Sequence, residues 1–138
     1  MKALTICQPY AELIARGDKP IENRTWATAY RGPLAIHAGK SLTWFDPEAD
    51  WRLYRIRKSD LALGAVVAVA DLVACLHVDQ AWPIRLRNLQ SHEHANGPWC
   101  WILENIRRID PVHVRGSQGL WEIPLSQTKE YSRVDGLR

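Results

Sequence analysis

Eight residues near the N-terminus bring a lysine, a carboxylate and an arginine together at short spacing. Residues 17–24 read Gly-Asp-Lys-Pro-Ile-Glu-Asn-Arg. A lysine beside a carboxylate can act in acid–base or nucleophilic chemistry when burial or a neighbouring cation lowers its pKa. An arginine can bind a phosphate or a base edge through two parallel hydrogen bonds. We therefore take Lys19, Glu22 and Arg24 as the first candidate site, with a purely structural ion-pair network as the alternative.

Positive charge is concentrated in the same part of the chain. The 138 residues carry 18 Lys and Arg and 15 Asp and Glu, and this net charge of +3 is too small to identify a polyanionic partner. Residues 1–58, however, hold ten basic against six acidic residues. Within this segment Arg31 and Lys40 add to Lys19 and Arg24 as groups that could neutralise phosphates.

Aromatic and histidine side chains extend the candidate site. Stacking on an aromatic ring contributes on the order of 1–3 kcal/mol per base and tolerates any base. Seven tryptophans in a domain of this size more often form core and rim, so each one has a structural interpretation too. His37 could serve as an acid or a base, or be a hydrogen-bonded histidine at a strand end. The candidates for stacking are Tyr10, Trp26, Trp99 and Trp101.

Composition excludes several classes of protein. With 46% hydrophobic and 24% charged residues, the chain is typical of one folded domain rather than a disordered one. Its three cysteines are widely spaced and predict neither a disulfide framework nor a zinc site. Residues 92–94 read His-Glu-His but lack a third ligand, so we expect no metal and no cofactor. Without a signal peptide or an apolar run long enough for a membrane span, we expect a cytoplasmic protein.

Hydrophobic periodicity predicts a mostly β domain of the α+β class over residues 1–125, followed by a polar tail over 126–138. Helices are expected at 10–16 and 47–58, the second with Trp51, Tyr54 and Leu53 facing inward. Residues 80–97 are expected to be irregular. Short strands are expected at 3–7, 21–26, 34–38, 99–103, 106–109, 112–114 and 120–123, with one long strand at 64–78.

Spaced as G-x-K-x-x-E-x-R, residues 17–24 resemble the signature of the ASCH family, which is named for its homology to activating signal cointegrator 1. The likeness extends over most of the chain. The opening strand with its Gln-Pro-aromatic turn, the segments at 30–38 and 64–75, and the closing blocks at 97–105 and 119–122 all resemble that family in order.

This resemblance implies a small PUA-like β-barrel with short flanking helices and a cleft lined by the G-x-K-x-x-E-x-R segment. It also implies a nucleic-acid ligand, with RNA favoured over DNA, or a nucleoside-sized ligand. In such a cleft Lys19, Arg24 and Arg31 would hold phosphate, Glu22 would orient Lys19 or accept from a base edge, and Trp26 or Trp101 would stack. A protein-interaction role is a third interpretation.

An enzyme is the alternative that the resemblance raises. Some small members of the superfamily are amidohydrolases of acylated cytidine, and they use the motif lysine with a threonine three residues after it. Here that position is Glu22, so the pattern departs from theirs. A metal-independent ribonuclease would need a base and an acid. Lys19 with Glu22 would be the catalytic pair in either case, and His37 and Tyr10 could join them in a ribonuclease.

Overall fold

Six strands and several short helices make up residues 1–124, the part of the chain that the computed structural model describes. The strands are β1 (Lys2–Ile6), β2 (Ile21–Arg24), β3 (Gly32–Ala38), β4 (Ala65–His77), β5 (Trp99–His113) and β6 (Leu120–Glu122). The α-helices are α1 (Tyr10–Ala15) and α2 (Pro47–Tyr54), and two 3₁₀ segments, η1 (Lys58–Asp60) and η2 (Ile84–Ser91), follow the second of them.

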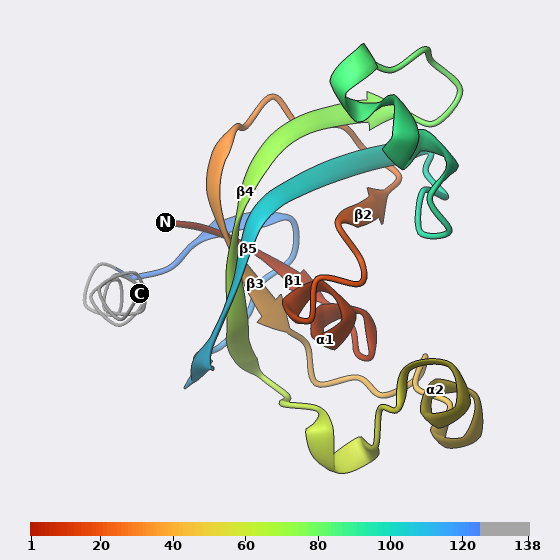
Figure 1. Cartoon of the computed structure of the whole chain (residues 1–138). Coiled ribbons are helices and arrows are strands. Elements are labelled where there is room, and N and C mark those ends of the chain that lie inside the picture. The colour runs from red at the N-terminus through yellow and green to blue at the C-terminus, as the bar shows by residue number, and fades with distance from the viewer. Residues whose placement is uncertain (125–138) are drawn as a thin grey trace.

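All six strands form one sheet in the order β2-β5-β4-β3-β1-β6. β1 pairs with β3 in parallel, and every other pair is antiparallel. The long strands β4 and β5 curve strongly, so that the sheet curls around α1 as a half-barrel (Figure 1). Helix α1 packs against β3, β4 and β5. The predicted mostly β, barrel-like fold with short helices is confirmed.

The start of α1 is held by a buried glutamine. Gln8 accepts a hydrogen bond from the Glu12 backbone N–H at 2.9 Å and donates to the Ala62 carbonyl at 2.8 Å. Its side chain therefore satisfies a backbone donor that the first turn of a helix leaves free, and it also ties the helix to the segment before β4. This contact explains the glutamine of the Gln-Pro-aromatic turn.

Helix α2 begins where the sequence predicts but ends earlier. Asp46 caps it by accepting from the backbone N–H groups of Glu48 and Ala49. Arg55 then takes a left-handed conformation with φ of 57°, which ends the helix at Tyr54 rather than at Lys58. The prediction that Trp51 and Leu53 face inward is wrong, because both side chains are exposed. The guanidinium groups of Arg55 and Arg57 lie over the Trp51 ring instead.

The three short strands predicted between residues 99 and 114 are one continuous strand, β5. Asn105 takes a positive φ of 50° within it, and the pairing with β4 shifts register beside it and again beside Pro111. A bulge leaves a residue unpaired, so it can accommodate both a left-handed asparagine and a proline that has no N–H to donate. The apparent turn signals are therefore bulges in a bent strand.

Two further expectations concern the C-terminal tail and membrane-spanning helices. The polar tail predicted at 126–138 lies outside the described residues. Within residues 1–124, no helix has the length and apolar character needed to cross a membrane.

Candidate functional site

Strand β2 presents the acidic and basic residues of the G-x-K-x-x-E-x-R segment on one side. It pairs antiparallel with β5, so that Glu22 lies opposite Trp101 and Arg24 lies opposite Trp99. Because side chains alternate along a strand, Glu22 and Arg24 share a face. Gly17, with φ of 86°, turns the chain after α1 so that Lys19 reaches the same place.

These residues form a nearly buried network of ion pairs. The Lys19 ammonium donates to Glu22 Oε1 at 3.0 Å and to the Ile21 carbonyl, and Arg24 donates from Nε to Glu22 Oε2 at 2.9 Å. Lys19 is 3% exposed and Glu22 is 7% exposed. The structural ion-pair network considered as an alternative is therefore present, and it also borders a cavity.

Two adjoining cavities surround this network. The first cavity, of about 730 Å³, extends from Arg24 to the loop at 115–119 between β5 and β6. The second cavity, of about 760 Å³, extends from Arg24 toward Cys7, Tyr10, Lys19 and His94. Both volumes fall in the range of about 300–1,000 Å³ that is usual for small-molecule sites. The two cavities share five lining residues, Thr5, Arg24, Trp26, Gly39 and Lys40, which we call the shared wall.

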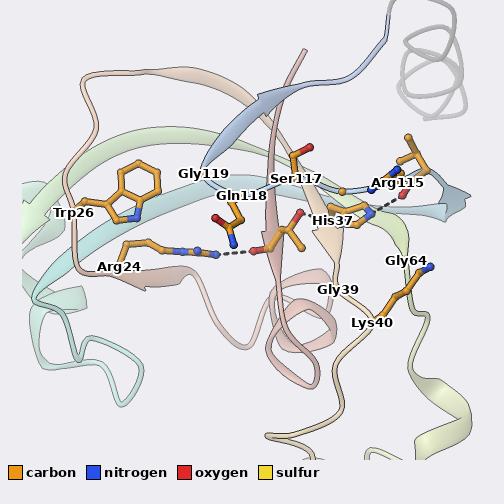
Figure 2. Close-up of a pocket in the computed structure, with 13 residues that line it drawn as sticks. Arg24, Trp26, His37, Gly39, Lys40, Gly64, Arg115, Ser117, Gln118 and Gly119 are labelled. Atoms are coloured by element: carbon orange, nitrogen blue, oxygen red, sulfur yellow. Dashed lines mark hydrogen bonds between the residues drawn. The ribbon is translucent and has the colours of Figure 1, made fainter.

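Positive charge dominates these cavities. Lys40 and Arg115 are exposed, and neither makes a hydrogen bond or an ion pair with another residue of 1–124. Arg24 uses Nε and Nη2, the latter for the Thr5 carbonyl at 2.8 Å, and leaves Nη1 without a partner among those residues. Within the described lining Glu22 is the sole acidic residue. Figure 2 shows Arg24 at one side of the first cavity and Arg115 at the other.

Trp26 offers an aromatic surface at the shared wall. It is 37% exposed, whereas Trp101 behind it has no exposed surface. The two rings meet edge to face, with centroids 4.8 Å apart, and the Trp101 indole N–H donates to the Trp26 carbonyl. Trp101 can therefore support Trp26 but cannot reach a ligand itself. In the second cavity Tyr10 provides a further ring, 5.8 Å from the Lys19 ammonium.

Two candidate residues lie away from the cavities. Arg31 is exposed and donates to the carbonyls of Thr28 and Tyr30, and the described lining of neither cavity includes it. Trp99 is half-buried and packs edge-on against His77, with ring centroids 5.1 Å apart. Ligand contact by Arg31 or Trp99 stays a prediction from the sequence.

His37 lies at the base of the first cavity with both ring nitrogens occupied. The Trp121 indole N–H donates to Thr5 Oγ1 at 3.2 Å, and Thr5 Oγ1 lies 3.1 Å from His37 Nδ1. Because the Val114 carbonyl can only accept, Nε2–H donates to it at 2.7 Å. In a neutral ring Nδ1 then accepts from the Thr5 hydroxyl, whose oxygen accepts from the indole. Burial lowers the pKa of His37. The neutral ring is thus the form that this chain of hydrogen bonds fits.

The loop at 115–119 was missing from the predicted site. Gly116 lies so close to His37 that a Cβ on it would meet His37 Cε1 at 2.6 Å. Only glycine lets this loop sit against the histidine and border the first cavity. The sequence Arg-Gly-Ser-Gln-Gly contains the turn signal, but its nearness to His37 depends on the return of the chain from β5 to β6.

His94 was also missed as a cavity residue, because the sequence suggested only a metal role for it. It is 8% exposed, and its buried Nε2 makes no hydrogen bond but lies 3.6 Å from Glu93 Oε1. Burial, followed by the positive charge of Lys19, lowers the pKa of His94. Asn23 holds this segment in place by donating to the His94 carbonyl and accepting from the backbone N–H groups of Asn96 and Gly97.

The described residues contain no cluster of potential metal ligands. Among residues 1–124, no three His, Cys, Asp or Glu side chains gather where they could hold an ion.

Comparison with known proteins agrees with the sequence motif. The model of the ASCH domain matches residues 4–113. The chain belongs to the ASCH domain family. Activating signal cointegrator 1 from Homo sapiens is 26% identical over 129 residues, and the Mus musculus protein is 35% identical over 129 residues. Each alignment covers 87% of this ASCH chain but 22% of the relative, so the chain spans about a fifth of the length of these relatives.

Solved structures show the same fold. The crystal structure of ASCH from Zymomonas mobilis has a TM-score of 0.57 at 14% identity, and the alignment covers 96% of this chain and 93% of that one. The crystal structure of a mutant ZmASCH protein from the same organism gives a TM-score of 0.58 at 14% identity, with 96% of each chain covered. The resemblance extends across the whole ASCH fold, including the strands that border the cavities.

Proposed function

We propose that this ASCH domain binds single-stranded nucleic acid, with RNA favoured over DNA, or a nucleoside-sized ligand, in the two adjoining cavities. The observation that carries the proposal is the shared wall, where Arg24 and Lys40 face the cavities beside the exposed ring of Trp26. Cations next to an aromatic surface are the combination that single-stranded nucleic acid requires, because the backbone is anionic and the bases stack.

The ion-pair network supports this role by placing Arg24. Glu22 binds both Lys19 and Arg24, so the guanidinium is held on two sides, by Glu22 and by the Thr5 carbonyl. A fixed guanidinium loses little conformational entropy when it binds phosphate. In this proposal Arg24 and Lys40 contact phosphate, Trp26 stacks on a base, and Lys19 acts through Glu22 as a positioning residue.

A titration of the wild-type protein with single-stranded RNA and with DNA of the same sequence tests the proposal. Tryptophan fluorescence, followed at several salt concentrations, should show quenching that weakens as salt rises. Lys40→Ala should lower affinity several-fold and reduce the slope of log affinity against log salt by about one. Lys58→Ala, an exposed lysine of η1 outside the lining of both cavities, is the matched control and should change neither quantity. Identical curves for Lys40→Ala and wild type would refute the role of the shared wall.

A hydrolase is the second candidate, because Lys19, Glu22 and Tyr10 all line the second cavity. Such an enzyme would cut RNA or an acylated nucleoside with Lys19 and Glu22 as its catalytic pair. RNA recovered from the titration and run on a denaturing gel tests the first reaction, and chromatography of N-acetylcytidine incubated with the protein tests the second. Turnover that Glu22→Gln abolishes in a folded protein would establish the hydrolase, whereas intact substrates leave the binding role.

A further inference from the structure

The first cavity carries cations at both of its ends. Arg24 lies on one side of His37, and Lys40 and Arg115 lie on the other (Figure 2). The described lining of this cavity includes no aspartate and no glutamate. Three cations thus border a space that has no acid of its own, and they do so in two separate places.

Lys40 and Arg115 come together beside Gly64. The stem of Lys40 rests so close to this glycine that a Cβ on it would meet Lys40 Cε at 3.0 Å. The Gly64 carbonyl accepts from the backbone N–H of Val114 at 3.2 Å, and Arg115 is the next residue along the chain. Neither cation makes a hydrogen bond or an ion pair with another residue of 1–124. Two unpaired cations at one end of a cavity favour an anion such as a phosphate.

The Arg24 end of the cavity is built differently. The guanidinium is held by Glu22 and by the Thr5 carbonyl, which leaves Nη1 as its donor without a partner among residues 1–124. The partly exposed ring of Trp26 lines the cavity at the same end. This end therefore combines one donor for a phosphate with a surface on which a base can stack.

A neutral stretch separates the two ends. Both ring nitrogens of His37 are occupied, by Thr5 and by the Val114 carbonyl, so the histidine offers no free polar atom between the cations. Gly116 packs against that ring, and a Cβ on it would meet His37 Cε1 at 2.6 Å. A ligand that satisfies the whole cavity must therefore carry its negative charges apart from each other, with an uncharged part between them.

We propose that the first cavity holds one nucleoside of a single strand with a phosphate on each side of it, one phosphate at Arg24 and the other at Lys40 and Arg115. The inference rests on the proposed function and makes it more specific. A nucleoside with one phosphate would leave one cationic end without a partner. Arg115, which lies outside the G-x-K-x-x-E-x-R segment, thereby becomes a phosphate-binding residue.

Isothermal titration of the whole chain with small ligands tests the need for two separated charges. A nucleoside 3′,5′-bisphosphate should bind at least tenfold more tightly than the 3′-monophosphate or the 5′-monophosphate of the same base, and than pyrophosphate. The monophosphates have the base without the second charged group, and pyrophosphate has two charged groups without the spacing. Equal binding of the bisphosphate and any of these three controls would overturn the proposal.

A trinucleoside diphosphate, which has two linkages, tests which cations share a phosphate. Arg24→Gln, Lys40→Ala and Arg115→Ala should each weaken its binding several-fold. When one linkage is replaced by a neutral methylphosphonate, Lys40→Ala and Arg115→Ala should both lose their effect, and Arg24→Gln should keep it. Neutralising the other linkage should give the reverse. These comparisons are double-mutant cycles in which one partner is the ligand.

Two patterns in that experiment would overturn the proposal. Loss of all three effects at the same linkage would mean that a single phosphate is bound, and loss of the Lys40 and Arg115 effects at different linkages would mean that these two cations do not share a phosphate. Arg52→Ala, at an exposed arginine of α2 outside the lining of both cavities, is the matched control and should leave every ligand unaffected.

A longer strand separates failure of this inference from failure of the proposed function. If a twelve-residue single strand binds with the salt dependence expected above while the trinucleoside diphosphate does not bind or shows either contrary pattern, only this inference fails. If no strand binds, the proposed function fails with it. Arg115→Ala should keep the wild-type urea midpoint, because its side chain has no partner within residues 1–124, so a loss of binding in this variant reports on the ligand.

Discussion

Two buried glutamates in this fold, Glu12 and Glu22, each bind two cations, and the two clusters have different roles. Glu12 on α1 accepts two hydrogen bonds from Arg108 of β5, at 3.0 and 2.7 Å, and a third from Arg16 at 2.7 Å. Glu22 on β2 is bound by Lys19 and Arg24. The first cluster fastens the helix to the sheet, and the second borders the cavities.

The exposure of the cations separates the two clusters. The side chains of Arg108 and Arg16 are 49% and 27% exposed, so both reach water, whereas that of Lys19 is 4% exposed. Hydrogen bonding to Glu12 raises the pKa of Arg108, which keeps that pair charged. Around Glu12, where both arginines reach water, the ion pairs therefore fasten the helix to the sheet. Around Glu22, where Lys19 is enclosed, they hold Arg24 in a fixed position.

The largest effect that separates the clusters is on stability. Glu22→Leu leaves the Lys19 ammonium buried without its carboxylate, and the free energy of unfolding should fall by about 3–5 kcal/mol. Glu12→Leu leaves arginines that can turn to solvent, and the loss should be about 1–3 kcal/mol. Urea denaturation of both variants measures the two losses. The double variant Lys19→Met/Glu22→Leu should recover much of the larger loss, and equal losses for the two single variants would remove the distinction.

The second effect is on affinity. Arg24→Gln and Arg108→Gln each remove one cation from a buried glutamate, but only Arg24 lines the cavities. Arg24→Gln should weaken binding of single-stranded RNA about tenfold, which corresponds to the loss of one charge-assisted hydrogen bond. Arg108→Gln should leave the affinity unchanged. Fluorescence titrations of the two variants with single-stranded RNA measure both affinities. A comparable loss of affinity in Arg108→Gln would mean that binding depends on the fold as a whole.

A third and smaller effect follows from pH, because buried histidines lie only on the cavity side of this comparison. The pKa values of His37 and His94 are lowered from 6.5, so the unfolded chain takes up protons first as the pH falls. Their contribution to stability is complete above pH 6.5 and is lost as the pH falls below it. Urea midpoints between pH 8 and 5 should decline less in His94→Gln than in wild type. His113→Gln, at an exposed position, should follow the wild-type curve.

The smallest effect is on thiol reactivity. Burial and the charge of Glu22 raise the pKa of Cys7, which lines the second cavity. Glu22→Gln should therefore speed alkylation of Cys7 about twofold at constant pH, since more thiolate is present. Glu12→Gln should not change it. Mass spectrometry after iodoacetamide pulses gives both rates, with the partly exposed Cys75 as an internal reference; slower labelling in Glu22→Gln would contradict the assignment.

Local patterns in the sequence predicted much of this fold. Alternation placed Glu22 and Arg24 on one face of a strand, and the helix expected at 47–58 does begin at Pro47. Patterns failed where long-range contacts decide the outcome. Asn105 and Pro111 indicate turns, but pairing with β4 carries β5 through both as bulges.

The sequence brought several of the cavity-lining residues together but not the full extent of the cavities. Lys19, Glu22, Arg24, Trp26 and Lys40 do come together, because four of them lie within eight residues. His94 and the loop at 115–119 join them only through the curl of the sheet and the bonds of Asn23, about 70 residues away in sequence. Nothing in their own neighbourhoods gives that proximity.

The hydrogen bond from Arg24 to the Thr5 carbonyl has a consequence for motion. It links β2, which lies at one end of the sheet order, to β1, near the other end. Edge strands this short open readily, and their amides exchange with solvent through such local openings. A ligand bound by both Arg24 and Thr5 would strengthen this link between β2 and β1. Ligand binding in the cavities would then slow the amide exchange of β2, a strand far shorter than those that form the core.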